Sequence, residues 1–564
     1  MKLVLLATVT ALSLAACARA PEQPAPAHTT SSPALPPLTV DPIAATPATY
    51  TLTLLHTNDV HSRFDPLKEG EGPAVGGVLQ RKAAIDRVRH ERGDDHVLLV
   101  DAGDFSVGTV WDAVWGRSAE IAVMNALGYD VITPGNHEFD EGPALLAFAL
   151  GGGVLKVAGV EHRMGPFEGK VVASNVEFED PAQGEFVLRH AVRARGGTRV
   201  GFVGAVTEQA VEMPAVHGVK VHPYVESVQR EVDELTAQGV KEIVLISHCG
   251  TAVDKANAEK LTGVDVIVSG HDHAFLGDLA TLKAGGLSDA ALKKLTGPYP
   301  MHVKAKDGHD VLLVSAGSWG RALGRLDLTF DSEGHVIESG GAPIVLRDEP
   351  DAARDPALVK LLAELRAPVD ARGGELLTNL PHDLAPAPEG QTELGAVFAE
   401  GMLAAAKKEG AVAALAEGDA RNALPAGPLT YGKLFEAFPF ALNVQVVEVS
   451  GEDLLHIVAH GLGAEEPPLQ LAGMTARVVR GKPEEDAKVV ELKIGGKPVS
   501  PKGRYTIAVD EYVGAGMDGF TWFKGAKGKS LPMRVVDAAA AELRAHGGKV
   551  MGAPLAQRVV EVRQ

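Results

Sequence analysis

From Tyr50 to about residue 330, short apolar runs of β type alternate with segments whose apolar residues recur at helical spacing. Strands that alternate with helices are typical of layered α/β domains. We therefore expect an α/β fold over this part of the chain. The predicted strands are 50–56, 96–100, 131–133, 199–203, 242–247, 264–269 and 311–315, and the predicted helices include 78–91 and 225–238.

Polar side chains that bind divalent metals follow five of these apolar runs directly. In chain order they are Asp59 and His61, then Asp104, then Asn136, then His248, and finally His271 and His273. Open α/β sheets bind ligands at the carboxyl ends of their strands, so we expect these side chains to meet at one edge of a sheet. Two carboxylates, one amide oxygen and four imidazoles suit Mn, Fe, Zn or Co, and they are poor for Ca or Mg as sole occupants.

The composition excludes several other classes of function. With 54 Lys+Arg against 73 Asp+Glu, the net charge of −19 argues against nucleic-acid binding as the main activity. Two cysteines in 564 residues exclude a disulfide scaffold and Cys-rich zinc or iron–sulfur sites.

The order of the five motifs (DxH, GD, GNHE, a later His, then GHxH) resembles the calcineurin-like metallophosphoesterases. Together with the second half of the chain, it resembles the bacterial 5′-nucleotidase/UDP-sugar hydrolase family. The resemblance implies a four-layer metallophosphoesterase sandwich followed by a smaller α/β domain. It implies two divalent transition metals and hydrolysis by a hydroxide held between them. One metal would take Asp59, His61 and His273, the other Asn136, His248 and His271, and Asp104 would bridge the two.

His137 directly follows the predicted ligand Asn136, so we expect its side chain to point at the phosphoryl group instead of the metal. Asp140 lies three residues later and can orient the imidazole by a hydrogen bond. The resemblance makes His137 and Asp140 the catalytic dyad, in which His137 stabilises the developing charge and protonates the leaving oxygen.

The second half of the chain resembles the family more loosely, at 392–395, 427–440 and 516–519. The resemblance implies that Arg421 grips a phosphate, that Phe440 and Tyr512 sandwich a base, and that Asp518 bonds ribose hydroxyls.

The chain also departs from the family pattern at Ala416, Asp419 and Leu442. A polar site that loses its donors loses discrimination. The resemblance makes a nucleoside monophosphate, cleaved to nucleoside and phosphate, the preferred substrate, and because of these departures other possibilities stay open. One alternative is a hydrolase of the same fold that acts on a non-nucleotide ester, including a thiosulfohydrolase-like enzyme. Another is a cyclic-nucleotide phosphodiesterase. A third, of a different class, is a binding lipoprotein with a decayed site. The complete metal set speaks against the last.

The N-terminus predicts export and a lipid anchor. A single Lys is followed by an apolar run at 3–14 and then by small residues before Cys17, which resembles a bacterial lipobox. The run is too short for a transmembrane helix. Cys17 would be lipidated, and Ala18 after it favours the outer membrane. We expect contact with the membrane through the lipid anchor only, and the sequence does not identify a protein partner.

These observations together predict the domain limits. They are a signal peptide at 1–17, a Pro/Ala-rich tether at 18–49, a dimetal metallophosphoesterase domain at 50–345, a connecting helix within 346–372 and a substrate-binding domain at 373–564. We expect the connecting helix to cover 351–367 and to end at Pro368.

Overall fold

The structure is a computed structural model that describes residues 49–562 except 69–71, 212–217, 348–354, 387–389, 417–419, 421, 441, 464–467 and 482–484. Cys17, Arg421, the signal peptide and all but the last residue of the tether lie outside the described residues. By its internal contacts the chain divides into a unit that ends at Ala44 and a unit from Ala45 to Gln564. All of the described residues belong to the second unit.

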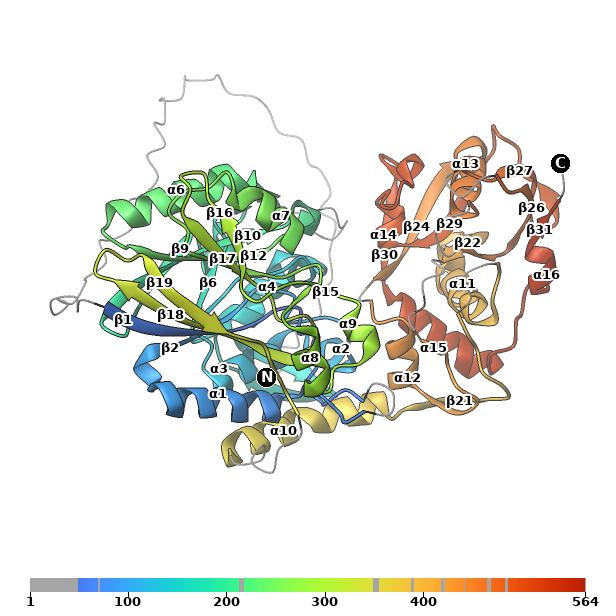
Figure 1. The fold of residues 1–564 in the computed structure, drawn as a ribbon. Helices are drawn as coiled ribbons and strands as arrows, with labels where there is room; N and C mark the ends of the chain where they lie inside the picture. Colours follow the sequence, from blue (N-terminus) through green and yellow to red (C-terminus); the bar gives the residue numbers. More distant parts are fainter. Residues whose placement is uncertain are drawn as a thin grey trace, which may run out of the picture. The chain divides into compact units, whose positions relative to one another are not determined.

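Two β-sheets form the framework of the N-terminal domain (Figure 1). In spatial order the first contains β19 (Val336–Gly341), β18 (Ala322–Asp331), β1 (Thr49–Thr57), β2 (Val97–Asp101), β3 (Val131–Ile132), β6 (Lys170–Val172) and β8 (Val187–Leu188), with β20 (Ile344–Val345) paired to β18. The second contains β16 (Met301–Lys304), β17 (Asp310–Val314), β13 (Val266–Ser269), β12 (Glu242–His248), β10 (Thr198–Val206) and β9 (His190–Arg195). Strand β1 is parallel to β2 and antiparallel to β18.

Helices cover the outer faces of both sheets. The helices on the first sheet are α1 (Val78–Arg92), α2 (Val110–Trp115), α3 (Ser118–Leu127) and α4 (Pro143–Gly151), and those on the second are α6 (Tyr224–Ala237) and α7 (Thr251–Ala258). Of the shorter helices, α5 (Pro181–Gly184) packs against β7 (Val176–Phe178), and α8 (Leu279–Gly285) packs against α9 (Asp289–Leu292). Small strand pairs lie at the periphery: β4 (Gly153–Val157) with β5 (Val160–Met164), β7 with β11 (Val219–Val221), and β14 (Phe275–Leu276) with β15 (Leu295–Gly297).

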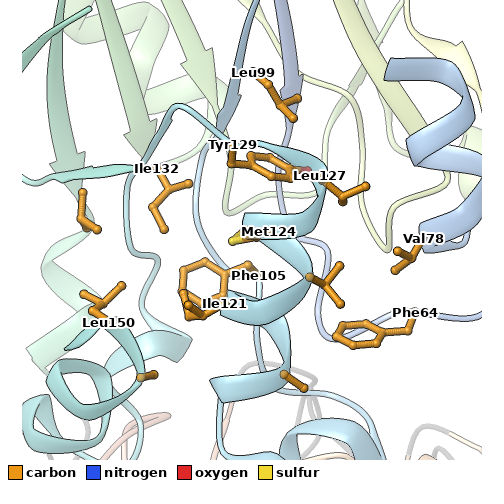
Figure 2. Close-up of a cluster of buried hydrophobic side chains, with 14 of the residues drawn as sticks. Phe64, Val78, Leu99, Phe105, Ile121, Met124, Leu127, Tyr129, Ile132 and Leu150 are labelled. Atoms are coloured by element: carbon orange, nitrogen blue, oxygen red, sulfur yellow. The ribbon is translucent and has the colours of Figure 1, made fainter. Parts of the chain in front are cut away.

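Strand alternation divides the apolar residues among three cores. Leu98 and Val100 of β2 point inward and pack with Ile246 of β12 between the two sheets. Leu99, one residue out of phase, packs on the opposite face against the helices, and Figure 2 shows it above Ile121, Met124 and Leu127 of α3. On the far side, Leu245 of β12 packs with Val228, Val232 and Leu235 of α6. The domain is therefore a four-layer α/β/β/α sandwich, as predicted.

The expectation that all five motif-bearing strands end at one edge of a single sheet is wrong. Strands β1, β2 and β3 belong to the first sheet, whereas β12 and β13 belong to the second. Parallel strands covered on both faces are apolar on both faces, so their sequences do not reveal which sheet each one joins. The two sheets pack face to face and their carboxyl ends meet.

The expectation that the connecting helix ends at Pro368 is also wrong, because α10 (Pro356–Gly373) continues through the proline. A proline inside a helix costs about 3 kcal/mol. Leu365 and Val369, on either side of it, are both buried, and the Trp115 indole donates a hydrogen bond of 2.9 Å to the Leu365 carbonyl. Packing on both sides of Pro368 thus outweighs the local penalty.

The C-terminal domain is a smaller α/β unit. Its main sheet contains β25 (Gln470–Ala472), β22 (Ala413–Ala416), β29 (Arg504–Asp510), β24 (Asn443–Ser450) and β30 (Gly528–Arg534), and a second contains β28 (Lys497–Pro498), β27 (Lys488–Ile494), β26 (Met474–Val479) and β31 (Val559–Glu561). β21 (Leu376–Leu380) pairs with β23 (Gly427–Thr430), and the helices are α11 (Glu393–Ala406), α12 (Tyr431–Ala437), α13 (Gly451–Gly461), α14 (Glu511–Gly514), α15 (Val535–His546) and α16 (Leu555–Arg558). None of the described helices combines the length and the apolar character that a bilayer crossing requires.

Candidate dimetal site

The loops that leave β1, β2 and β3 meet the loops that leave β12 and β13. Oδ2 of Asp104, after β2, lies 3.1 Å from Nε2 of His248, at the end of β12. The backbone amide of His271, after β13, donates to both carboxylate oxygens of Asp59 at 3.0 Å. The carboxyl ends of the two sheets therefore deliver the predicted side chains to one place.

The first group of possible ligands consists of Asp59, His61 and His273. The Nε2 atoms of His61 and His273 are 3.0 Å apart, and Nε2 of His273 lies 3.5 Å from Oδ1 of Asp59. One ligand atom from each residue lies within 4.8 Å of the others. Two imidazole nitrogens at this separation can share one proton in a hydrogen bond, and when neither is protonated both can bind the same cation.

The second group consists of Asp104, His248 and His271, joined by Asn136. The Asn136 side-chain oxygen is 3.2 Å from Nε2 of His248 and 3.0 Å from Nδ1 of His271. Oδ2 of Asp104 also lies 3.9 Å from His61 of the first group. Asp104 is therefore placed between the groups, as a bridging carboxylate would be, and all seven predicted side chains converge.

The backbone of the site is strained. Five of the seven residues have positive φ angles that only glycine adopts easily: Asp59 (52°), His61 (51°), Asp104 (52°), His271 (86°) and His273 (59°). Each such conformation costs on the order of 1 kcal/mol or more and persists only where the surroundings impose it. These five are among the eleven non-glycine residues with positive φ in the described part of the chain, and strain that gathers in this way is typical of a functional site.

Glu138 organises two of the loops and was not singled out from the sequence, although it belongs to the GNHE motif. It is fully buried and accepts hydrogen bonds from the amides of Asp104 (2.8 Å), Gly135 (2.6 Å) and Ser106 (3.0 Å). The loops approach so closely that a Cβ atom on Gly135 would lie 2.1 Å from Oδ1 of Asp104. Glycine is therefore required at this position.

Burial keeps three of the four histidines, His61, His271 and His273, ready to bind a cation. It lowers the pKa of both His271 and His273 to about 4, so these imidazoles are neutral at pH 7. Nδ1 of His248 lies 2.6 Å from the carbonyl of Ala102, which fixes the tautomer that turns Nε2 toward Asp104. Burial also raises the pKa of Asp59 to about 8, because a negative charge there lacks compensation without a cation.

His137 and Asp140 lie together beside the second group. Nδ1 of His137 is 2.7 Å from Oδ2 of Asp140, and the His137 amide donates to Oδ1 of Asp104 at 3.0 Å. Burial opposes the positive charge of His137, but Asp140 and Asp104 outweigh it and raise the imidazole pKa to about 10. The His137 imidazole is thus held in place by a carboxylate that favours its protonated form.

The residues predicted to bind substrate are only partly brought together. The Tyr512 hydroxyl donates to Oδ1 of Asp518 at 3.0 Å. Phe440 packs edge-to-face on Phe438 with ring centroids 4.9 Å apart. Phe440 and Tyr512 are both partly buried against the same apolar cluster of the C-terminal domain.

Comparisons with known proteins agree with both domains. Residues 52–275 match the family of calcineurin-like phosphoesterases, and residues 375–525 match the 5′-nucleotidase C-terminal domain. The chain is 31% identical to a 5′-nucleotidase precursor of known structure from Thermus thermophilus, with a TM-score of 0.69, covering 91% of this chain and 100% of that one. It is 28% identical to an apyrase from Aedes aegypti over 85% of this chain and 86% of that one. It is 26% identical to a probable 5′-nucleotidase from Treponema pallidum over 84% and 87% of the two chains. The chain therefore belongs to the 5′-nucleotidase family, with a calcineurin-like phosphoesterase domain followed by a 5′-nucleotidase C-terminal domain.

Proposed function

We propose that this protein is a metal-dependent phosphoester hydrolase of the 5′-nucleotidase type, which converts a nucleoside monophosphate to nucleoside and phosphate. One observation carries the proposal: two groups of metal-binding side chains, connected by Asp104, lie beside the hydrogen-bonded pair His137–Asp140. Similarity to 5′-nucleotidases over nearly the whole chain supports the nucleotide substrate.

The donor set favours two divalent transition metals, Mn, Zn, Fe or Co. We assign Asp59, His61 and His273 to one metal, Asn136, His248 and His271 to the other, and Asp104 to both. When bound, such a pair of cations activates water and stabilises negative charge on the phosphoryl oxygens.

We assign protonation of the leaving group to the dyad, His137 and Asp140. His137 is partly exposed, so its Nε2 atom can reach a bound phosphate ester, while Nδ1 is engaged by Asp140. A protonated imidazole in this position can donate its proton to the leaving ester oxygen. Asp140 keeps the ring oriented and stabilises its charge.

For the substrate we propose that Phe440 and Tyr512 stack on the base, that Asp518 bonds the ribose and that Arg421 binds phosphate. The Tyr512–Asp518 hydrogen bond supports two of these roles, because it places an aromatic ring next to a hydrogen-bond acceptor. Similarity to apyrases favours a second candidate, a nucleotide phosphatase of broader range.

We further propose that the protein is exported and held at the membrane, preferably the outer one, by a lipid on Cys17. The lipobox-like sequence that ends at this residue supports the proposal. Replacing Cys17 with Ala should release the protein from the membrane fraction without changing its activity.

A substrate panel on Mn²⁺-loaded protein tests the activity. The panel contains nucleoside mono-, di- and triphosphates, a cyclic nucleotide and p-nitrophenyl phosphate. We expect the highest kcat/KM on a monophosphate. Equal rates on di- and triphosphates would favour the broader range, and hydrolysis of p-nitrophenyl phosphate alone would contradict the nucleotide assignment.

A further inference from the structure

Arg117 is a fully buried arginine behind the dyad, and nothing in its sequence context singles it out. Its side chain has no exposed surface. Nη2 donates to the backbone carbonyl of His137 at 2.9 Å, and Nη1 donates to Oε2 of Glu141 at 3.0 Å. The turn from His137 to Asp140 carries both dyad residues. One guanidinium therefore binds this turn twice, at its first residue, His137, and at Glu141, which directly follows it.

The backbone at Arg117 is strained to place this side chain. Arg117 has φ 70° and ψ −16°, in the left-handed region, at the junction between α2 and α3. A non-glycine residue pays on the order of 1–2 kcal/mol for this conformation. Such strain persists only where the surroundings impose it, and here the contacts made by the guanidinium supply that constraint.

The surroundings of Arg117 favour a guanidinium, which is always charged and presents several N–H donors in a fixed plane. Burial opposes its charge, but the carboxylates of Asp112 and Glu141 outweigh burial and raise its pKa above the ordinary arginine value. Glu141 is shared, since its other oxygen accepts a hydrogen bond from Arg534 at 3.1 Å. A lysine carries the charge but lacks two donors in fixed geometry.

Arg117 bonds the carbonyl of His137, and the other main-chain polar group of His137, its amide, is hydrogen-bonded too. The His137 amide donates to Asp104, and the carbonyl also accepts from the amide of Asp140 at 3.3 Å. Together with the ring contact to Asp140, the bond from Arg117 leaves the imidazole little freedom. Misplacement of a catalytic group by 1 Å can lower a rate by about 10²-fold.

We propose that Arg117 is a positioning residue, whose guanidinium fixes the His137 carbonyl and thereby aims the imidazole at the phosphoryl group. This inference rests on the proposed function, because it assigns His137 to the reaction. It predicts that removing Arg117 lowers kcat through His137 and leaves the metals in place.

A double-mutant cycle between Arg117 and His137 tests the proposal, with p-nitrophenyl phosphate as substrate and Mn²⁺-loaded protein. We expect R117M to lower kcat by about 10–100-fold, with KM and two metals per chain retained. In the H137A background, R117M should change kcat by less than about threefold, since its effect passes through the absent imidazole. Wild-type kcat in R117M, or losses that multiply in the double variant, would overturn the proposal.

Two further variants keep the test decisive. If R117M does not fold, R117K, which retains the charge, replaces it in the same cycle and is judged by the same outcomes. R558M is the matched control, because Arg558 is equally buried and pairs with Glu400 within the C-terminal domain. It should lower stability while kcat stays within about threefold of wild type; a loss of kcat as large as that of R117M would show a general folding effect.

A crystal structure of the metal-loaded Arg117 variant gives a second reading that does not depend on turnover. The proposal expects a displaced His137 ring with all seven metal-binding side chains in place. An undisturbed His137–Asp140 contact would overturn it. A wild-type protein that hydrolyses no phosphate ester would contradict the proposed function instead, and the position of the ring would still decide the role of Arg117.

Discussion

Asp104 and His248 lie 3.1 Å apart although their strands belong to different sheets. This contact closes the gap between the two halves of the sandwich at their carboxyl edges. Because Oδ2 of Asp104 also lies 3.9 Å from His61, one carboxylate reaches both groups of possible ligands. The carboxylate of Asp104 therefore lies where it can serve both groups.

Replacing Asp104 with Asn should abolish turnover and reduce bound metal below two per chain, because a neutral amide cannot bridge two cations as a carboxylate does. Metal content by elemental analysis and the rate on a phosphate ester check this result. D272N is the control: Asp272 stands between His271 and His273 but bonds the amide and hydroxyl of Thr251 instead. Full metal content and a normal rate in D104N would contradict the bridging role.

Replacing His137 with Ala should leave both metals bound and lower kcat by roughly 10²–10⁴-fold, the range for a positioned acid. The His137 side chain bonds Asp140 rather than a predicted ligand, so its loss removes proton transfer alone. Steady-state kinetics and metal analysis on the same sample make the measurement. Loss of metal would instead identify His137 as a ligand.

Replacing Phe440 with Ala should raise KM for nucleotides by about 10-fold or more, on the scale of about 1–3 kcal/mol for a base stacked on an aromatic ring. The same variant should hydrolyse p-nitrophenyl phosphate almost normally, because that ester has no base. Equal losses on both substrates would indicate a folding defect. Normal behaviour on both would exclude Phe440 from the base site.

The stability of the N-terminal domain should depend on pH through Asp254. This carboxyl has no exposed surface, and burial raises its pKa from 3.8 to about 6, although it accepts hydrogen bonds from Ser247, Ser269 and Tyr224. The folded state therefore holds the proton more tightly than the unfolded state. The stabilisation from this proton is fully present only below the unfolded pKa of 3.8, and it is lost as the pH rises through the folded pKa of about 6.

The D254N variant isolates that contribution, because an amide does not titrate. Between pH 4 and pH 7 the free energy of unfolding of the wild type should fall relative to D254N by about 2 kcal/mol, most of the roughly 3 kcal/mol that the whole shift is worth at about 1.4 kcal/mol per pKa unit. Urea unfolding of metal-free protein at a series of pH values measures the difference. A constant difference between the two proteins across this range would contradict the prediction.

The resemblance carried by the order of the motifs predicted the four-layer fold. The convergence of the seven side chains could be predicted because each motif directly follows an apolar run, and such order is local. The sequence did not predict that His248 and His271 come from a second sheet, since buried parallel strands look alike whichever sheet they join. Nor did it predict the roles of Glu138 and Arg117, which depend on hydrogen bonds to the backbone of distant loops. The predicted helix end at Pro368 was wrong for the opposite reason, because tertiary packing outweighed a strong local preference.

The position of β1 has a consequence for how the protein matures. This first strand lies between β2 and β18, and Thr53 is paired with Asp327. The first sheet therefore cannot be completed until the chain has been made, or delivered across a membrane, as far as residue 331, where β18 ends. Pairing over so long a separation is intrinsically slow. The N-terminal domain should thus stay open for most of its synthesis, and complete metal capture should be a late event in its biogenesis.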